Sequence, residues 1–468
     1  MAQDLTRGGD PAEGREAAAT ASAARTSDDS AAGTSVEAMA SAQSEAARSV
    51  AAHSVPEIEG QLDKLWARAA AARADQARAR IALTAAQAEA AARAAAALAA
   101  ADDPGDAHLV SARSSVLNLV VIAGHRETAD YCSSIIADTA GRHPSRSLII
   151  SAVDPEGPPG LQARIEALTL STAGGRAETG AETIHVTASG ETGQHLASII
   201  VPLLVHDLPV AVWWPHDPQF RSRRADRLLT FADRLIVDGS SWSGDGLDRL
   251  AEMATVASAG ALVVADFALL RQARWREAIA SVYDLPDLRA HLRSVRSIVV
   301  EFAAEREGDP AGTTNIVRPV YHVAWLASRL GMTVSAPLRS RSNGIRTATL
   351  RQGGHDVAVE FRPAISDLGA GSTVRIELES RVRGAELVGQ IEAGDLTVDV
   401  TVRDKGRERV KRTYLAPRLN DVDLICRAVE DSAADPVAVG ALAMAGRIIA
   451  GDAAPGTASH RRRRDADA

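Results

Sequence analysis

Histidine, aspartate and tryptophan side chains are concentrated in residues 205–217, which read VHDLPVAVWWPHD. The two His-Asp pairs of this segment are a candidate metal or acid–base site. Between them, Pro209 to Trp214 are mostly apolar and are bounded by prolines, which predicts a β-strand. An extended strand rises about 3.3 Å per residue and holds His206 and His216 roughly 20 Å or more apart. Because zinc binds its ligands at about 2.0–2.2 Å, the two histidines cannot share an ion.

Other residues with catalytic potential follow predicted strands. In an open parallel sheet, ligands bind outside the carboxyl ends of the strands, so these residues form one candidate small-molecule site. An enzyme that binds a small molecule or a nucleotide sugar is therefore one hypothesis. The alternative is that they are ordinary turn and cap residues, which are rich in Asp, Ser and Gly. The candidates are Gly124-His125-Arg126, Asp154, Trp214-Pro215-His216-Asp217, Asp238-Gly239-Ser240-Ser241-Trp242 and Asp266.

The sequence matches none of the specific catalytic or nucleotide-binding motifs considered below. A lone Gly124 follows the first predicted strand where a dinucleotide site has GxGxxG, and no GxxxxGK[ST] or HExxH occurs. GSSWSG at 239–244 resembles a nucleophile elbow, but Ser243 stands in place of the second glycine. The two cysteines, Cys132 and Cys426, form no CxxC, which fits a reducing cytoplasm. The sequence therefore predicts no catalytic residue, no metal and no cofactor.

The elements that must position these residues alternate from about 115 to 300. Continuous apolar strands are predicted at 116–124, 147–153, 209–214, 234–238 and 261–266, and amphipathic helices at 126–141, 193–204, 223–232, 245–257 and 269–283. Alternation of this kind predicts an α/β fold with a mostly parallel sheet covered by helices. The segments 294–305 and 317–332 are expected to extend or close that domain.

After about residue 333 the apolar period changes to two, which predicts a smaller antiparallel, β-rich (α+β) domain with two short helices near 420–431 and 435–450. The polar first 52 residues cannot bury a core and are expected to be disordered. A long alanine-rich helix should begin near Ser54 and end at Asp102-Asp103-Pro104-Gly105. The predicted organisation is a leader (1–52), an α/β domain (53–332), a β-rich domain (333–452) and a basic tail (453–468).

Charge and hydropathy exclude several classes of partner for these 468 residues. The net charge of −8 argues against a nucleic-acid-binding protein, and the one dense basic run, Arg461–Arg464, lies in the polar tail. The most hydrophobic window contains two prolines, a histidine and an aspartate, which predicts no membrane span. A cytoplasmic protein without membrane or nucleic-acid partners is expected. Arg142 and Arg146, in RHPSR, could hold an anion or an acidic protein partner.

Several segments together resemble a known family. VLNLVVIAG, RHPSRSLIIS, DLPVAVWWP, ADRLIVDGSSW, ARWREAIA and VAWLASRLGM occur in the order seen in the OpcA family of glucose-6-phosphate dehydrogenase assembly proteins. The resemblance covers about 56–450. One block departs from the family pattern DLxWxRLxxWRE: it reads DFALLRQARWRE, so Leu269 or its neighbour replaces the first tryptophan, while Arg271, Trp275 and Arg276 remain.

The resemblance implies a non-enzymatic accessory protein that binds glucose-6-phosphate dehydrogenase and promotes its assembly or allosteric activation, in support of the oxidative pentose phosphate pathway. A scaffold for an unrelated partner is a further alternative. Side chains alternate along a strand, so Trp213 is expected in the core and Trp214 partly exposed as a partner anchor. The candidate partner-binding residues are Trp214, Arg142, Arg146, Arg271 and Arg276.

Overall fold

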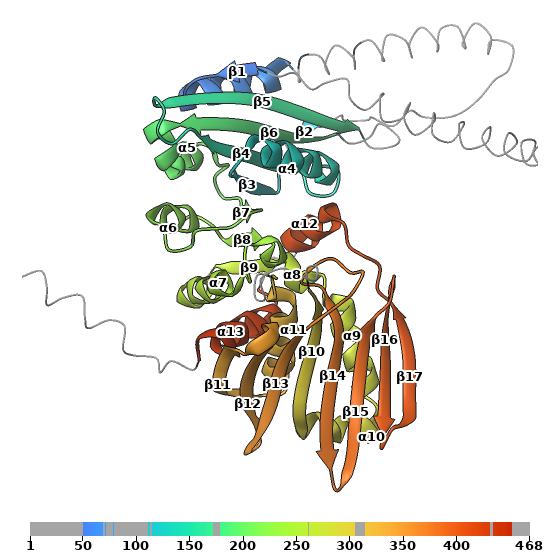
Figure 1. Ribbon diagram of the computed structural model, residues 1–468. Helices are drawn as coiled ribbons and strands as arrows, with labels where there is room; N and C mark the ends of the chain where they lie inside the picture. Colours follow the sequence, from blue (N-terminus) through green and yellow to red (C-terminus); the bar gives the residue numbers. More distant parts are fainter. Residues whose placement is uncertain are drawn as a thin grey trace, which may run out of the picture.

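Two large β-sheets organise the chain (Figure 1). The computed structural model describes residues 50–68, 71, 78, 111–112, 115–171, 178–260, 262–304, 314–430 and 434–451. Most of the predicted leader, the alanine-rich continuation to Gly105 and the Arg461–Arg464 run lie outside the described residues.

The first sheet has nine strands within the described part of the chain, and its central strands run parallel. The expectation of a mostly parallel sheet is confirmed, with an antiparallel hairpin, β5–β6, added at one side. In spatial order the strands are β1 (Val50–Ala52), β5 (Gly160–Ser171), β6 (Glu178–Ser189), β4 (Ser145–Val153), β3 (Leu117–Ala123), β7 (Val210–Trp214), β8 (Arg234–Val237) and β9 (Val263–Asp266), and β2 (Ser111–Ala112) pairs with β6.

Helices cover both faces of this sheet. Helices α4 (Arg126–Thr139) and α12 (Asp421–Glu430) pack on one face, where Trp213 lies. The other face is covered by a helix over residues 55–68 and by α5 (Leu196–Leu203), α6 (Arg223–Leu229) and α7 (Leu247–Ala259). Ser54 precedes that first helix, as predicted, and its carbonyl accepts the Ile58 N–H at 3.0 Å. A 3-10 turn, η1 (Gly190–Gln194), leads into α5.

The second sheet has eight strands in the described residues and is antiparallel except for β10 beside β13. The strands predicted after residue 333 are all present in it. Its edge strand β17 reads RERVKRTYL, and charged edges of this kind discourage pairing with another chain. In spatial order the strands are β11 (Thr333–Ser340), β12 (Arg346–Gln352), β13 (His355–Ala364), β10 (Val295–Ala303), β14 (Thr373–Val382), β15 (Ala385–Ala393), β16 (Thr397–Asp404) and β17 (Arg407–Leu415), and η4 (Ser342–Gly344) joins β11 to β12.

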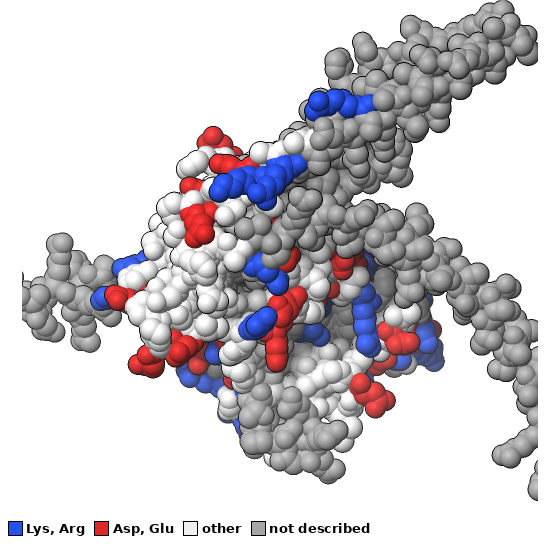
Figure 2. All heavy atoms as spheres, turned by 90° about the horizontal axis from the view of Figure 1, so that it is seen from above, with Lys and Arg blue, Asp and Glu red and all other residues white. Residues whose placement is uncertain are grey.

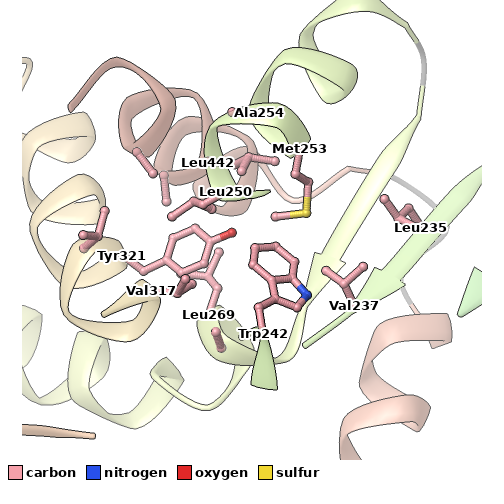
Figure 3. Close-up of a cluster of buried hydrophobic side chains, with 14 of the residues drawn as sticks. Leu235, Val237, Trp242, Leu250, Met253, Ala254, Leu269, Val317, Tyr321 and Leu442 are labelled. Carbon is pink, nitrogen blue, oxygen red and sulfur yellow. The ribbon is translucent and has the colours of Figure 1, made fainter. Parts of the chain in front are cut away.

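Helices between and beside the two sheets complete the fold (Figure 1). Among them α13 (Pro436–Ala450) packs on both α11 (Val317–Arg329) and α7, and Trp242 and Tyr321 lie inside the cluster shown in Figure 3. The remaining helices are η2 (Gly239–Ser241), α8 (Phe267–Leu270), α9 (Ala273–Tyr283), α10 (Pro286–Arg289) and η3 (Ala290–Arg293). None of the described helices is long and apolar enough to cross a membrane.

Three segments lie elsewhere than the sequence predicted. Strand β1 falls within the predicted leader, yet it pairs with β5 and buries Ala52. Strand β10 was expected in the first domain but lies between β13 and β14, and its alternating burial is that of a half-buried strand. Helix α12 was expected in the C-terminal domain but covers α4 on the first sheet. A division at residues 332 and 333 therefore does not follow the two sheets.

Candidate functional site

A cavity of about 610 Å³ lies at the carboxyl edge of the first sheet. The parallel strands β3, β7 and β8 all end at this edge, so the residues that follow them meet there. The structure thereby brings together several residues that the sequence placed at this edge. They are Gly124, His125, Trp214, His216, Asp217 and Ser241.

His216, Asp217 and Ser241 of this carboxyl-edge cavity are each bound to groups other than one another. His216 Nε2 lies 2.6 Å from Thr128 Oγ1, and Asp217 accepts the Ser243 N–H at 2.9 Å and pairs with Arg249 at 3.3 Å. Ser241 Oγ donates to the Asp238 carbonyl at 2.8 Å. A nucleophilic serine donates its hydroxyl proton to a general base such as histidine, whereas the Ser241 hydroxyl donates to a backbone carbonyl, which cannot act as that base. The arrangement does not assemble an acyl-transfer site.

The β3–α4 turn is the place where a doubly wound sheet holds a dinucleotide. Here the turn contains Gly124-His125-Arg126, and Glu127 occupies the first turn of α4. Pyrophosphate binds at a helix N-terminus through free N–H groups and the helix dipole. The first turn of α4 holds both Arg126 and Glu127, so charge does not decide the matter, but a single glycine stands where a dinucleotide site has GxGxxG, and the turn lacks the close backbone approach that pyrophosphate needs.

Asp266 and Asp238 follow adjacent strands but face the protein interior. The Asp266 carboxyl group, 3% exposed, accepts hydrogen bonds from Gly239 N–H at 2.9 Å, Ala268 N–H at 2.8 Å and Tyr321 O–H at 2.9 Å. Burial raises the pKa of Asp266 to about 6. Asp238 pairs with Arg271 at 2.8 Å. These carboxylates join the ends of β8 and β9 to the helices beside them.

Arg146 was predicted to contact a partner, and its position corrects that prediction. It is the second residue of β4, is 8% exposed, and pairs with Glu182 of β6, which is 1% exposed. Its Nη1 also donates to the Leu203 carbonyl at 2.9 Å. Glu182 accepts the Trp66 indole N–H at 2.7 Å. Arg146 therefore ties the N-terminal helix and α5 to the sheet, out of reach of a partner.

Trp214 differs from its expected exposure as well. The two tryptophans point to opposite faces, as predicted, and Trp213 is 2% exposed in the core beside α4. Trp214 is only 9% exposed, because its ring packs edge-on against Phe220 with 6.4 Å between centroids. It forms part of the wall of the carboxyl-edge cavity and is not an exposed anchor.

The remaining candidate arginines lie in three different settings. Arg142, at the end of α4, has 61% of its side chain exposed and lies 3.4 Å from Asp423. Arg271 bridges Asp238 and Asp421 with 22% of its side chain exposed. Arg276 is half-buried and donates to the Leu269 carbonyl at 2.7 Å. Leu269, where the family pattern has tryptophan, is a core residue at 4% exposure. Arg142 is the most accessible of the five candidates.

Histidine, cysteine and carboxylate side chains of the described residues form no group of three that could hold a metal ion. His206 and His216 lie beyond opposite ends of β7, consistent with the separation expected from the strand length.

The two thiols are expected to be inert in the native protein. Cys132 and Cys426 are free and buried, and burial raises the pKa of the Cys132 thiol to about 12. Since the thiolate is the reactive form, Cys132 should not react with a water-soluble disulfide reagent until the chain unfolds, and burial alone should protect Cys426 in the same way. Cys132→Ser combined with Cys426→Ser should also give the same partner response as the wild type, with or without reductant. Rapid labelling of the folded wild type would contradict the prediction.

Sequence comparisons find a protein family and individual proteins that are similar to this chain. The family model for the OpcA glucose-6-phosphate dehydrogenase subunit N-terminal domain matches residues 136–255, and that for the C-terminal domain matches residues 262–435. A "Putative OxPP cycle protein OpcA" of Nostoc punctiforme is 29% identical over 148 residues, 31% of this chain and 30% of that protein. A protein of the same name from Synechocystis is 27% identical over 154 residues, 32% of this chain and 30% of the relative. These alignments thus span less than a third of the relatives' length.

Solved structures that align with this chain are distant from it in sequence. The putative oxidoreductase yvaA from Bacillus subtilis aligns with a TM-score of 0.40 and 10% identity, over 72% of this chain and 95% of that one. The transcriptional regulator Gal80p from Kluyveromyces lactis aligns with a TM-score of 0.38 and 10% identity, over 72% of this chain and 89% of that one.

Proposed function

We propose a function from the premise that this chain belongs to the OpcA family of glucose-6-phosphate dehydrogenase assembly proteins. The proposed function is to bind glucose-6-phosphate dehydrogenase and to promote the assembly or activation of that enzyme. The observation that carries the proposal is that the N-terminal and C-terminal family models both match, in order, over more than half of the chain. The physical mechanism is differential binding, in which the accessory protein has the higher affinity for the more active state of the enzyme.

The geometry of the carboxyl-edge cavity supports an accessory role over catalysis. His216, Asp217 and Ser241 are each bound to groups other than one another, and the β3–α4 turn has a single glycine where a dinucleotide site has GxGxxG. The alternative, an enzyme acting on a small molecule such as a nucleotide sugar, rests on the size of that cavity, about 610 Å³, which lies in the range of small-molecule sites.

The direct test is a titration of the cognate dehydrogenase with the purified chain. We expect the rate of NADPH formation to rise and saturate, and the two proteins to co-elute in a complex of defined mass. The chain without the enzyme should form no NADPH from glucose 6-phosphate and NADP⁺. Absence of both co-elution and a rate change would reject the accessory role and favour the enzymatic alternative.

Arg142 is proposed to contribute to docking. Acidic and basic side chains lie interspersed on the face shown in Figure 2, so individual charges are better candidates than a field of one sign. Arg142→Glu should raise the half-activating concentration roughly tenfold, through repulsion of an acidic group on the partner. Arg126→Glu, at the opposite end of α4 with 88% of the side chain exposed, is the matched control and should have little effect. Equal responses of the two variants would remove Arg142 from the interface.

A further inference from the structure

A second cavity, separate from the carboxyl-edge one, lies between the two sheets. Its volume is about 410 Å³, and it is lined by the α8–α9 junction, α11, the turns at one end of β14–β16, and the chain leading into α12. A volume of this size lies within the range of small-molecule sites. Arginine dominates its charged lining: the residues are Arg271, Arg274, Arg318, Arg418 and Arg427, with Asp395 as the one acid.

Positive charge in this arginine-lined cavity is only partly balanced. Arg271 and Arg274 pair with carboxylates. Arg318 donates to two serine hydroxyls, at 3.1 Å each, and neither it nor Arg418 or Arg427 has an ion pair among the described residues. The charges of Asp238 and Asp266 offset part of that of Arg318, whereas Arg418 and Arg427 could each bind an anion that enters the cavity. In a chain with a net charge of −8, the cluster is a local exception.

Buried polar atoms without partners concentrate at the same cavity. Of eight such side-chain atoms in the described residues, four belong to residues that line it. Three of these residues are more than nine-tenths buried: Gln272 is 3% exposed, His322 2% and Thr373 7%. The fourth is Arg318, through its Nε. Each of these atoms is out of contact with solvent in this structure, and a buried polar atom without a partner costs about 1–3 kcal/mol. A ligand whose hydroxyl groups drew these side chains round towards the cavity would recover part of that cost.

The neutral side of the cavity can bind hydroxyl groups. Burial, with Arg276 and Arg318 nearby, lowers the pKa of His322 to about 3, so its ring is uncharged at pH 7 and its Nδ1 can donate or accept according to tautomer. The Trp275 ring lies 5.0 Å from the His322 ring and also borders the cavity. Gln272, the N-cap of α9, makes no side-chain cap bond, and the first turn of α9 contains no acidic residue.

We propose that this cavity binds a small phosphorylated polyol, of the sugar phosphate class. Phosphate oxygens would accept hydrogen bonds from Arg318, Arg418 and Arg427, which match a phosphate in charge and geometry. Hydroxyl groups would bond to Gln272, His322 and Thr373, and Trp275 would cover one face of the polyol. The inference does not depend on the proposed function, because it concerns binding to this chain alone.

The test is binding of defined compounds to the full chain by calorimetry and by thermal unfolding. Glucose 6-phosphate is expected to bind and to raise the melting temperature progressively as its concentration increases. Glucose should not bind measurably, because it lacks the phosphate, and inorganic phosphate should bind at least about tenfold more weakly because it lacks the hydroxyl groups. If glucose 6-phosphate does not bind at millimolar concentration in low salt, or binds no more tightly than inorganic phosphate, the proposal is wrong.

Substitutions of residues that line the arginine-lined cavity test whether glucose 6-phosphate binds there. Arg418→Ala and Arg427→Ala should each weaken glucose 6-phosphate binding about tenfold, since each removes a charge-assisted hydrogen bond. Arg318→Lys keeps the charge but loses the planar fork, and should weaken binding while the protein stays folded. Arg412→Ala, on the exposed strand β17 outside this cavity, is the matched control and should bind like the wild type. Unchanged affinity in all three cavity variants would place the ligand elsewhere and overturn the assignment.

Discussion

Trp213→Ala is expected to lower the free energy of unfolding by about 3–5 kcal/mol. The Trp213 indole is 2% exposed and packs beside Phe267, with 6.4 Å between ring centroids, under α4 and α12. Removing it leaves a cavity in a layer formed by segments distant in sequence, which cannot collapse without moving a helix. Denaturant unfolding followed by circular dichroism measures the change.

Two further variants test whether the loss of stability comes from the space left by the Trp213 indole. Trp213→Phe should cost clearly less than alanine, because the smaller ring still fills part of the space and the indole N–H it removes has no partner among the described residues. Trp214→Ala should also cost less, because one side of that ring borders the carboxyl-edge cavity. A loss below about 1 kcal/mol for Trp213→Ala would show that the β7 layer repacks freely.

Strand β7 also shows what sequence patterns can predict. Its apolar run and flanking prolines predict a strand, and the period of two places Trp213 and Trp214 on opposite faces, as observed. The pattern does not reveal which residues cover each face. Phe220, six positions after Trp214, covers the second ring, and this follows from the path of the loop into α6. Exposure at a strand end is therefore decided by tertiary contacts.

Arg146 illustrates the same limit for charged residues. RHPSR reads as a solvated turn, but the last arginine begins the fully buried part of β4 and meets Glu182, which is 36 positions later in the sequence. No local pattern connects the two. Arg318 and His322 were missed for a related reason: their helix reads as core, and the available signal was a polar pair at i and i+4 within an apolar helix.

Asp266→Ala should destabilise the protein by about 3–5 kcal/mol, because it leaves three buried donors without their acceptor. The donors are Gly239 N–H, Ala268 N–H and Tyr321 O–H, which belong to η2, α8 and α11. Asp266→Asn keeps an amide oxygen for the two backbone N–H groups, and its NH₂ can donate to the tyrosine oxygen. It should therefore cost much less at neutral pH, and denaturant unfolding of both variants gives the comparison.

The difference in unfolding free energy between the wild type and Asp266→Asn is expected to change with pH in one direction. Burial raises the pKa of Asp266 to about 6, above its ordinary value of 3.8, and the nearby Asp238 adds to the increase. The folded protein then binds this proton more tightly than the unfolded chain.

The stabilisation that the protonated Asp266 carboxyl group contributes is fully present below about pH 4 and is lost as the pH rises to about 6, a change on the order of 3 kcal/mol. Unfolding free energies of wild type and Asp266→Asn, measured between pH 4 and 7, should therefore show the wild-type advantage shrinking as the pH rises. Carboxylates remote from Asp266 titrate equally in both proteins and cancel in the difference. A difference that stays constant, or grows with pH, would show that the three hydrogen bonds outweigh burial and keep Asp266 ionised in the folded protein.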